Sequence, residues 1–251
     1  MRSHQWRTAE NSAGFLLAHL SSGDRILDVG CGPGNITADL ARRVPGATVR
    51  GIDVSPEIIE RATSEYGSLP GLSFSVDDVY GLDAADATFD VVYVHQVLQH
   101  LHDPVSALRE IRRVLRPGGL VALREADFGG FFWHPRDPRL DDWMDLYHRV
   151  TVRNGAQADG GRYLPGWARA AGFDEMAVTS SNWTYESDED RRWWGGLWAD
   201  RVVLSEFARQ AVEYGEATSG ELEDLSRAFR EWAEAPEGLF VVPSVEVLAR
   251  R

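Results

Sequence analysis

An α/β fold, built on a parallel sheet with helices on both faces, is the class that this sequence predicts. Short apolar runs rich in β-branched residues alternate with amphipathic helical patterns along residues 25–126. Strand–helix–strand units of this kind form parallel sheets with right-handed crossovers. The first run ends in the glycine-rich turn GCGPG (30–34), which is typical of a ligand-binding loop at the carboxyl edge of such a sheet.

The first half of the chain predicts five strands and the helices between them. Ser55 is a suitable N-cap, with Pro56 at the first helical position and Glu57 in the electropositive first turn. A later helix carries apolar residues at helical spacing and ends at the turn RPGG (116–119). The expected strands are 25–29, 48–53, 72–76, 89–94 and 120–126, and the expected helices are 35–44, 56–66 and 103–115.

Past residue 127 the pattern changes, and we expect insertions between further core elements. Residues 128–158 show no obvious strand and are rich in aromatic side chains, so we expect them to form a lid. A helix (162–173) and two more strands (175–185 and 239–251) complete the core. We expect one domain, divided into an N-terminal cap (1–24), core (25–127), lid (128–158), resumed core (159–186), helical cap (187–236) and last strand (237–251).

The charge of the chain argues against a nucleic-acid partner. The formal net charge is −13, and nonspecific attraction to phosphates requires the opposite sign. We therefore expect a small or neutral partner. All basic residues are arginine, which removes the phosphate-binding lysine of GxxxxGK loops and any lysine Schiff base.

Cysteine usage and hydropathy bear on location. Cys31 is the only cysteine, so the chain can form no internal disulfide and no thiolate zinc cluster. The first residues lack the apolar core of a signal peptide, and no run of 18 apolar residues occurs. We expect a cytoplasmic, soluble protein without a metal or a membrane partner, either a monomer or a homodimer.

The glycine-rich turn predicts close approach of a ligand to the backbone. Glycines let main-chain N–H groups reach a ligand without an intervening Cβ, and the following helix N-terminus favours negative charge. Gly30, Gly32 and Gly34 are spaced GxGxG, with Asn35 where the dinucleotide fingerprint GxGxxG requires its last glycine. That departure weakens the prediction of a nicotinamide cofactor.

Two carboxylates after later strands favour adenosine as part of the ligand. Asp53 ends the second strand, where a carboxylate accepts hydrogen bonds from both ribose hydroxyls. Asp78 follows the third strand and can accept from an adenine amino group, although Asp77 could take the same part. Val79 is available for contact with the ring. Together the spacings favour adenosine without a pyrophosphate.

Several motifs in order carry a family resemblance. LDVGCGPGN, GIDVS, VDDVYGL, FDVVYVHQVLQHLHDP and ALREIRRVLRPGGLVALREAD resemble motifs of the class I S-adenosylmethionine-dependent methyltransferases, near the ubiquinone and menaquinone biosynthesis branch. The resemblance is strong over 21–127 and weaker over 160–185. It implies S-adenosylmethionine as cofactor and a Rossmann-like, seven-stranded sheet whose last strand is antiparallel, with an N-terminal helical cap and inserted lid helices.

The resemblance also implies roles for individual residues. Asp28 and the glycine turn would contact the methionine portion, Asp53 the ribose, Asp78 and Val79 the adenine, while His95 would lie beside the sulfonium. Arg7 and Asn11, in the N-terminal cap, could touch the cofactor or the substrate. The expected cofactor-binding residues are Arg7, Asn11, Asp28, Gly30, Cys31, Gly32, Gly34, Asn35, Asp53, Val54, Asp78, Val79, His95 and His100.

Three classes of function remain open on the sequence. The first is a methyltransferase acting on O, N or C of a small molecule, in secondary-metabolite tailoring or on a quinone-like acceptor. The others are a nicotinamide oxidoreductase and a non-catalytic cofactor-binding protein. His95 and Glu125 are the expected bases where the acceptor is protonated. Eight of the nine tryptophans follow residue 127, which favours an apolar or aromatic acceptor over a polar one.

Overall fold

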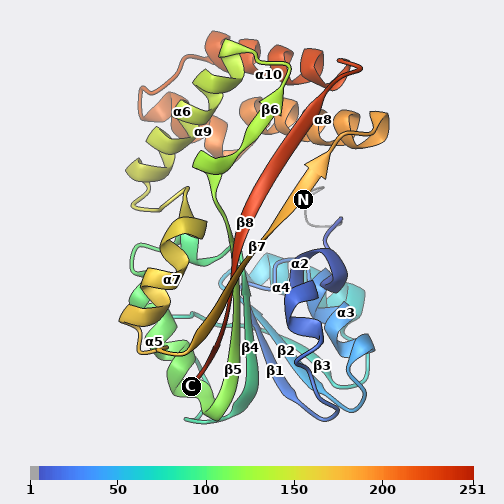
Figure 1. Cartoon of the computed structure of the whole chain (residues 1–251), viewed down its shortest axis with the longest axis vertical. Coiled ribbons are helices and arrows are strands. Elements are labelled where there is room, and N and C mark those ends of the chain that lie inside the picture. Colours follow the sequence, from blue (N-terminus) through green and yellow to red (C-terminus); the bar gives the residue numbers. More distant parts are fainter. Residues whose placement is uncertain (1–5) are drawn as a thin grey trace.

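The computed structural model describes residues 6–251, and the first five residues of the expected N-terminal cap lie outside this range. A mixed sheet with the order β3-β2-β1-β4-β5-β8-β6 runs through the molecule, and β7 pairs with the free side of β8 (Figure 1). The strands are β1 (Arg25–Val29), β2 (Thr48–Asp53), β3 (Leu72–Val76), β4 (Phe89–His95), β5 (Leu115–Ala126), β6 (Phe132–His134), β7 (Met176–Tyr185) and β8 (Leu239–Arg250).

The strand order places a switch point beside the first strand. β1 pairs in parallel with β2 on one side and with β4 on the other, so Val29 lies opposite both Ile52 and Val94. The chain leaves β1 and β4 toward opposite faces of the sheet, and ligands of such sheets bind in the crevice that this opens. The glycine turn after β1 and His95 at the end of β4 are thereby brought together.

Helices cover both faces of the parallel part, as the alternation of apolar runs predicts. α2 (Ala9–Leu17), α3 (Asn35–Arg43) and α4 (Pro56–Tyr66) lie on one face, and α5 (Pro104–Val114) and α7 (Gly160–Ala170) on the other (Figure 1). Each helix buries an apolar stripe, which gives two separate clusters of core side chains, one on each side of the sheet. Together they hold the carboxyl ends of the strands rigidly in place.

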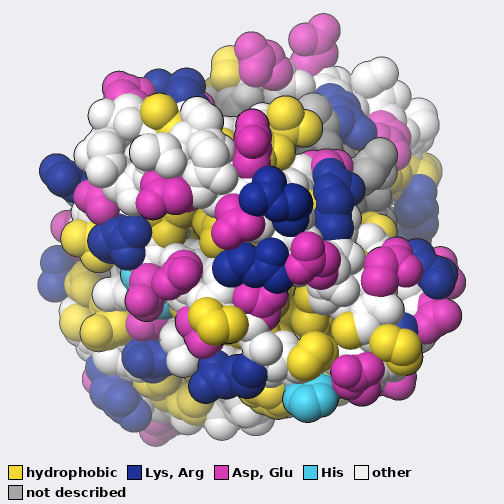
Figure 2. All heavy atoms as spheres, turned by 90° about the horizontal axis from the view of Figure 1, so that it is seen from above, with side chains coloured by type: hydrophobic (Ala, Val, Ile, Leu, Met, Phe, Trp, Pro, Cys, Tyr) yellow, Lys and Arg dark blue, Asp and Glu magenta, His cyan; other side chains and the backbone are white. Residues whose placement is uncertain are grey.

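A second helical layer stands over the carboxyl edge of the sheet. β7 and β8 extend beyond the parallel strands to reach α6 (Pro138–Arg153), α8 (Asp188–Leu204), α9 (Glu206–Glu213) and α10 (Ser219–Ala233) (Figure 1). The core of this layer is aromatic, with Trp143, Trp198 and Phe229 packed edge-on or stacked within 6 Å of one another. Its outer surface instead mixes arginines with acidic side chains (Figure 2).

The structure corrects the expected sheet in two places. Residues 132–134, in a segment expected to lack strands, form β6, so the sheet has eight strands and not seven. The cause is tertiary, because β8 extends past the end of β5 and leaves backbone groups at Leu239–Val241 that Phe132–His134 pairs with. β5 also begins at Leu115, earlier than the expected 120. As predicted, the last strand is antiparallel to its neighbours.

No helix formed by residues 6–251 is long and apolar enough to cross a membrane. Over the same range, no group of three histidine, cysteine or acidic side chains is arranged to hold a metal ion.

Candidate active site

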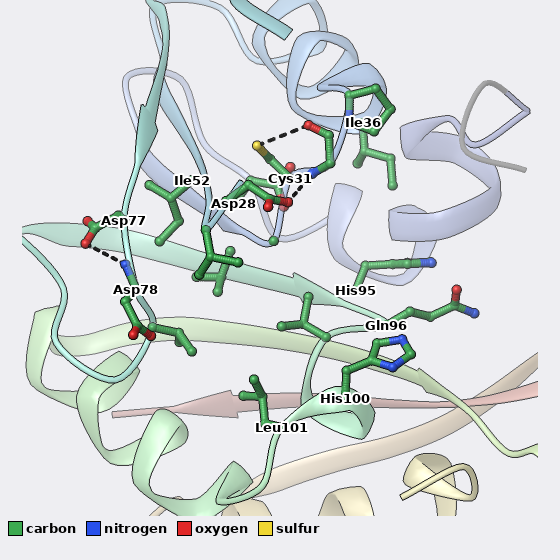
Figure 3. A pocket seen from close by; sticks show the side chains of 18 of the residues that line it. Asp28, Cys31, Ile36, Ile52, Asp77, Asp78, His95, Gln96, His100 and Leu101 are labelled. Atoms are coloured by element: carbon green, nitrogen blue, oxygen red, sulfur yellow. Dashed lines mark hydrogen bonds between the residues drawn. The ribbon is translucent and has the colours of Figure 1, made fainter. Parts of the chain in front are cut away.

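A cavity of about 520 Å³ opens at the carboxyl ends of β1, β2 and β4 (Figure 3). Its walls come from the turn after β1, the ends of β2 and β3, and the segment between β4 and the short 3-10 helix η1 (Leu98–His100). The predicted cofactor residues that line it are Arg7, Asp28, Gly30, Cys31, Gly32, Asn35, Asp53, Val54, Asp78, Val79, His95 and His100.

The glycines of the turn are required by its geometry. Gly30, Gly32 and Gly34 have φ values of 69°, 54° and 87°, in the left-handed region that other residues rarely adopt. A Cβ on Gly30 would lie 2.3 Å from Cγ2 of Val97. Gly34 does not line the cavity, which corrects its assignment to the cofactor; it is the N-cap of α3, and a Cβ there would lie 2.7 Å from the Phe74 ring.

Asp53 links the turn to the end of β2. Its carboxylate accepts hydrogen bonds from the backbone N–H of Gly32 at 3.2 Å and of Ser55 at 3.1 Å. These bonds fix the carboxylate while it still lines the cavity and is only half-buried. Lone pairs remain for two more donors, as binding of both ribose hydroxyls requires.

Asp28, at the floor of the cavity, is buried with one strong partner. It is 3% exposed and accepts a 2.7 Å hydrogen bond from the Thr37 hydroxyl. Burial raises the pKa of Asp28 to about 7, with a smaller contribution from the negative charge of Asp53. A carboxylate in this position favours a cationic ligand group, such as an ammonium, which would restore its ionised form.

The structure separates the two aspartates that the sequence left as alternatives. Asp77 accepts a hydrogen bond from the Arg50 guanidinium at 3.0 Å and from the backbone N–H of Asp83. Asp78 accepts only from the N–H of Tyr80, at 3.0 Å, and its second oxygen has no hydrogen-bond partner among residues 6–251. Asp77 therefore holds the loop together, and Asp78 keeps acceptor capacity at the cavity.

At the opposite end of the cavity lie His95, Gln96 and His100 (Figure 3). His95 is 6% exposed, and its Nδ1 lies 2.8 Å from the Tyr93 hydroxyl. That hydroxyl donates its own hydrogen to the carbonyl of Ser12, so it can only accept from His95. The hydrogen-bond network thus assigns the proton of the neutral ring to Nδ1 and the lone pair to Nε2.

Gln96 is a site residue that the sequence did not identify. Its φ of 53° is unusual for a residue other than glycine, and such strain is typical of functional positions. The backbone N–H of Gln96 donates to the carbonyl of Arg124, and its side-chain oxygen accepts from the Arg7 guanidinium. No local sequence signal marks this conformation, because it arises where β4 ends against β5.

His100 and Arg7 line the end of the cavity that also holds Gln96. The surface that His100 exposes lines this cavity and a second one beside it. Burial among protein walls lowers the pKa of His100 to about 4, with contributions from the charges of Arg201 and Arg7. His100 is therefore neutral at physiological pH, and it can accept or donate only as a neutral imidazole.

Two of the predicted residues lie away from the cavity. The side chain of Asn11 caps α2, accepting from the N–H of Thr8 and donating to the carbonyl of Trp6. Glu125 is fully buried, and its Oε1 accepts from the backbone N–H groups of Val97 and Leu98 at 2.9 and 2.7 Å. Both corrections have one cause: these polar groups satisfy buried or terminal backbone N–H groups.

The second cavity, of about 140 Å³, adjoins the first beneath the helical layer. Arg7, Gln96 and His100 line both cavities and form the junction between them. The other walls are mostly aromatic and come from the N-terminal segment, the segment after β5, α6, β7 and α8, which are far apart in the sequence. They include Trp6, Phe128, Phe131, Tyr147, Trp183, Tyr185, Trp193, Trp194 and Trp198.

Trp183 connects this aromatic wall with His95. Their rings stack at 5.8 Å between centroids, and the Trp183 indole N–H donates to the carbonyl of Asn11 at 2.9 Å. Arg124 lies on the Trp183 ring at 4.4 Å.

A doubly wound sheet with a carboxylate after β2 and a cavity at its switch point defines an enzyme that binds an adenosine-containing cofactor.

Comparison with known proteins identifies the family. Residues 27–123 match a family model described as a methyltransferase domain. An uncharacterised methyltransferase of Schizosaccharomyces pombe is 32% identical over 99% of this chain and 92% of its own. The 2-methyl-6-phytyl-1,4-hydroquinone methyltransferase of Synechocystis is 32% identical, over 66% of this chain and 51% of that protein.

A solved structure shares the fold. The phosphoethanolamine N-methyltransferase 2 of Haemonchus contortus, in complex with S-adenosylhomocysteine, superposes with a TM-score of 0.58 at 16% identity, covering 92% of this chain and 50% of that one. This chain belongs to the class I S-adenosylmethionine-dependent methyltransferases, and S-adenosylmethionine is its cofactor. The family removes the nicotinamide oxidoreductase from the alternatives, and the expected Rossmann-like sheet is confirmed.

Proposed function

We propose that the protein transfers the methyl group of S-adenosylmethionine to a small aromatic molecule bound in the smaller cavity. The observation that carries this proposal is the junction at Arg7, Gln96 and His100, where an aromatic cavity opens onto the cofactor cavity. A cavity of about 140 Å³ matches the size that holds a single benzene ring. Its aromatic walls suit a flat ring, which stacks offset or edge-on against them.

The residues of the larger cavity fit the cofactor. Gly30 and Gly32 line the cavity without a Cβ, Asp53 retains lone pairs for the ribose, and Asp78 has a free oxygen for the adenine amino group. Asp28 would face the ammonium of the methionine portion. The bound cofactor supplies an activated methyl group on a sulfonium.

The protein then has three tasks at the junction. It aligns the acceptor atom with the methyl group, and the aromatic walls keep water away from the reacting atoms. For a hydroxyl or protonated amine acceptor, Nε2 of His95 takes the proton, because Tyr93 holds the other ring nitrogen in its N–H form. We infer that His95 is the base and that Glu125 has only a structural part.

Two further points support a ring-shaped acceptor. The relative from Synechocystis is named for a 2-methyl-6-phytyl-1,4-hydroquinone, whose aromatic ring carries two hydroxyl groups beside its methyl and phytyl substituents. The outer surface of the helical layer carries ion pairs and no broad apolar area in the view from above (Figure 2). Many aromatic residues of this layer are buried, and Tyr147, Trp194 and Trp198 line the smaller cavity.

The proposal can be tested by offering the protein a panel of acceptors with methyl-labelled cofactor. The panel contains single-ring phenols, single-ring anilines, linear aliphatic alcohols and amines, and multi-ring phenols. We expect labelled product from single-ring acceptors, and its loss in Trp194→Ala. Trp167→Ala is the matched control, since Trp167 packs against Tyr163 on α7 and lines neither cavity. A preference for linear acceptors would contradict the proposal.

A further inference from the structure

The smaller cavity is lined by positive charge and by hydrogen-bond donors, which an apolar acceptor would not use. Arg7 and Arg201 both line it, and none of the described residues in its wall is acidic. The two guanidinium groups repel each other, and no carboxylate in the wall reduces this repulsion. An anion between the aromatic walls would offset that repulsion.

Arg201 is the exception among the arginines of the helical layer. In the described chain, every other arginine of α6, α8, α9 and α10 lies within 4.0 Å of a carboxylate oxygen. These ion-paired residues are Arg139, Arg149, Arg153, Arg191, Arg192, Arg209, Arg227 and Arg230. The intermingled dark blue and magenta side chains of Figure 2 illustrate how common such pairs are on this surface.

Among residues 6–251, no carboxylate oxygen lies within 4.0 Å of the Arg201 guanidinium, although an acid precedes Arg201 in the chain. Asp200 pairs with Arg230 at 2.9 Å instead. The guanidinium of Arg201 lies 4.9 Å from the centre of the Trp198 ring, one helical turn away on α8. This cation–π contact orients the charge without neutralising it, so Arg201 keeps its capacity for an anion.

A second, independent observation concerns buried donors in the same wall. The hydroxyl of Tyr185 and the indole N–H groups of Trp194 and Trp198 are buried and have no hydrogen-bond partner within residues 6–251. Tyr185 and Trp198 are each only 1% exposed. Buried polar groups are nearly always paired in proteins, so several orphaned donors around one cavity indicate an acceptor-rich ligand.

We propose that the methyl acceptor is an aromatic acid, whose carboxylate is bound by Arg201 and the buried donors while its ring fills the smaller cavity. This inference rests on the proposed function, since it names the class of acceptor for the same site. Arg201 lines only the smaller cavity, whereas Arg7, Gln96 and His100 lie at the junction. The carboxylate therefore stays within the smaller cavity, and a ring substituent that faces the junction receives the methyl group.

The test compares an acid with its neutral counterpart. Protein saturated with S-adenosylhomocysteine is titrated calorimetrically with 4-hydroxybenzoate and with 4-hydroxybenzamide, which have the same shape. We expect the acid to bind about tenfold more tightly, a modest factor because Arg201 is partly open to solvent and its charge is screened. In Arg201→Gln the preference for the acid should disappear, and in Arg201→Lys it should persist in part.

Arg209→Gln is the matched control, because Arg209 is an ion-paired arginine on α9 outside both cavities. It should leave the preference unchanged. Equal binding of both compounds, binding of neither, or an unchanged preference in Arg201→Gln would overturn the inference. Melting temperatures and S-adenosylhomocysteine affinity of the variants show that the fold and the cofactor site are intact.

Turnover with methyl-labelled cofactor distinguishes the two proposals. Methylation of neutral phenols without any preference for acids leaves the proposed function standing and removes the anchoring role of Arg201. Tight binding of aromatic acids without methylation of any ring acceptor would leave the anchoring role of Arg201 standing and would remove the proposed function.

Discussion

The Tyr93 hydroxyl lies 2.8 Å from Nδ1 of His95 and donates its own hydrogen to the Ser12 carbonyl. This relationship joins the N-terminal helix α2 to the reacting end of the cavity, because Ser12 belongs to α2 and both rings belong to β4. The orientation of the imidazole thus depends on a contact between segments about 80 residues apart in the chain. In the proposed mechanism, Tyr93 is therefore a positioning residue and His95 is the group that meets the acceptor.

Replacing Tyr93 by Phe should therefore lower turnover and leave cofactor affinity nearly unchanged. The variant loses a buried hydrogen bond worth about 1–3 kcal/mol and frees the imidazole to change tautomer, so kcat should fall about tenfold. Steady-state kinetics with calorimetric cofactor binding separates the two quantities. His95→Ala should reduce kcat further; a Tyr93→Phe enzyme with unaltered kcat would exclude the positioning role.

The neighbouring aspartates after β3 should behave differently on substitution. Asp78→Ala removes the acceptor that faces the cavity, and we expect the cofactor Kd to rise by the equivalent of about 1–2 kcal/mol. Asp77→Ala should instead lower the melting temperature, because Arg50 and the N–H of Asp83 lose their partner. Affinity and melting curves of both variants check this pair; the reverse pattern would mean that Asp77 serves the cofactor.

Asp53→Ala is expected to weaken cofactor binding by about 1–3 kcal/mol, since the ribose loses a charged acceptor and the backbone N–H groups of Gly32 and Ser55 lose their partner. The measurement is calorimetric titration with S-adenosylhomocysteine. Asp24→Ala, which changes an acid in the turn before β1 outside both cavities, is the control. Unchanged affinity in Asp53→Ala would place the ribose elsewhere.

Glu125 should prove dispensable for chemistry and important for stability. We expect Glu125→Gln to retain turnover, because the amide oxygen can still accept from Val97 and Leu98. Glu125→Ala leaves two buried N–H groups unpaired and should cost about 1–3 kcal/mol in the free energy of unfolding. Loss of turnover in a well-folded Glu125→Gln protein would restore its assignment as a base.

The pH dependence of stability gives a second check on Glu125. Burial raises the pKa of Glu125 to about 8, above its ordinary value of 4.5. The folded state therefore binds a proton that the unfolded state releases between these values, and this contribution to stability is lost as the pH rises through about 8. Denaturant unfolding of wild type should show that decline, and Glu125→Gln should show less of it.

The raised pKa of Asp28 predicts that cofactor binding releases a proton. Its pKa of about 7 means that the carboxyl is largely protonated below that pH, whereas an adjacent ammonium favours the ionised form. Binding of S-adenosylhomocysteine at pH 6 should thus release close to one proton, measured by calorimetry in buffers of different ionisation enthalpy. Asp28→Asn should abolish the release; a buffer-independent heat in wild type would contradict the linkage.

The local sequence was sufficient for the parallel part of the fold and for one end of the site. Apolar runs of five to seven residues identify β1 to β4 nearly to the residue, because strand formation here follows local burial patterns. The Gly30 turn and the aspartate ending β2 are equally local, since backbone conformation and strand-end position dictate them. The class of cofactor follows from those features.

The acceptor end of the site was decided only by tertiary structure. Gln96 adopts its left-handed conformation where two strands meet, and Glu125 points to backbone N–H groups that no spacing rule reveals. β6 exists because β8 extends beyond β5. The walls of the aromatic cavity come from segments far apart in the sequence, which include the N-terminal segment, β7 and α8. Arg201 can be distinguished from the other arginines of the layer only by their ion pairs, which the structure shows. Packing between distant segments sets these positions, so periodicity along the chain carries no signal for them.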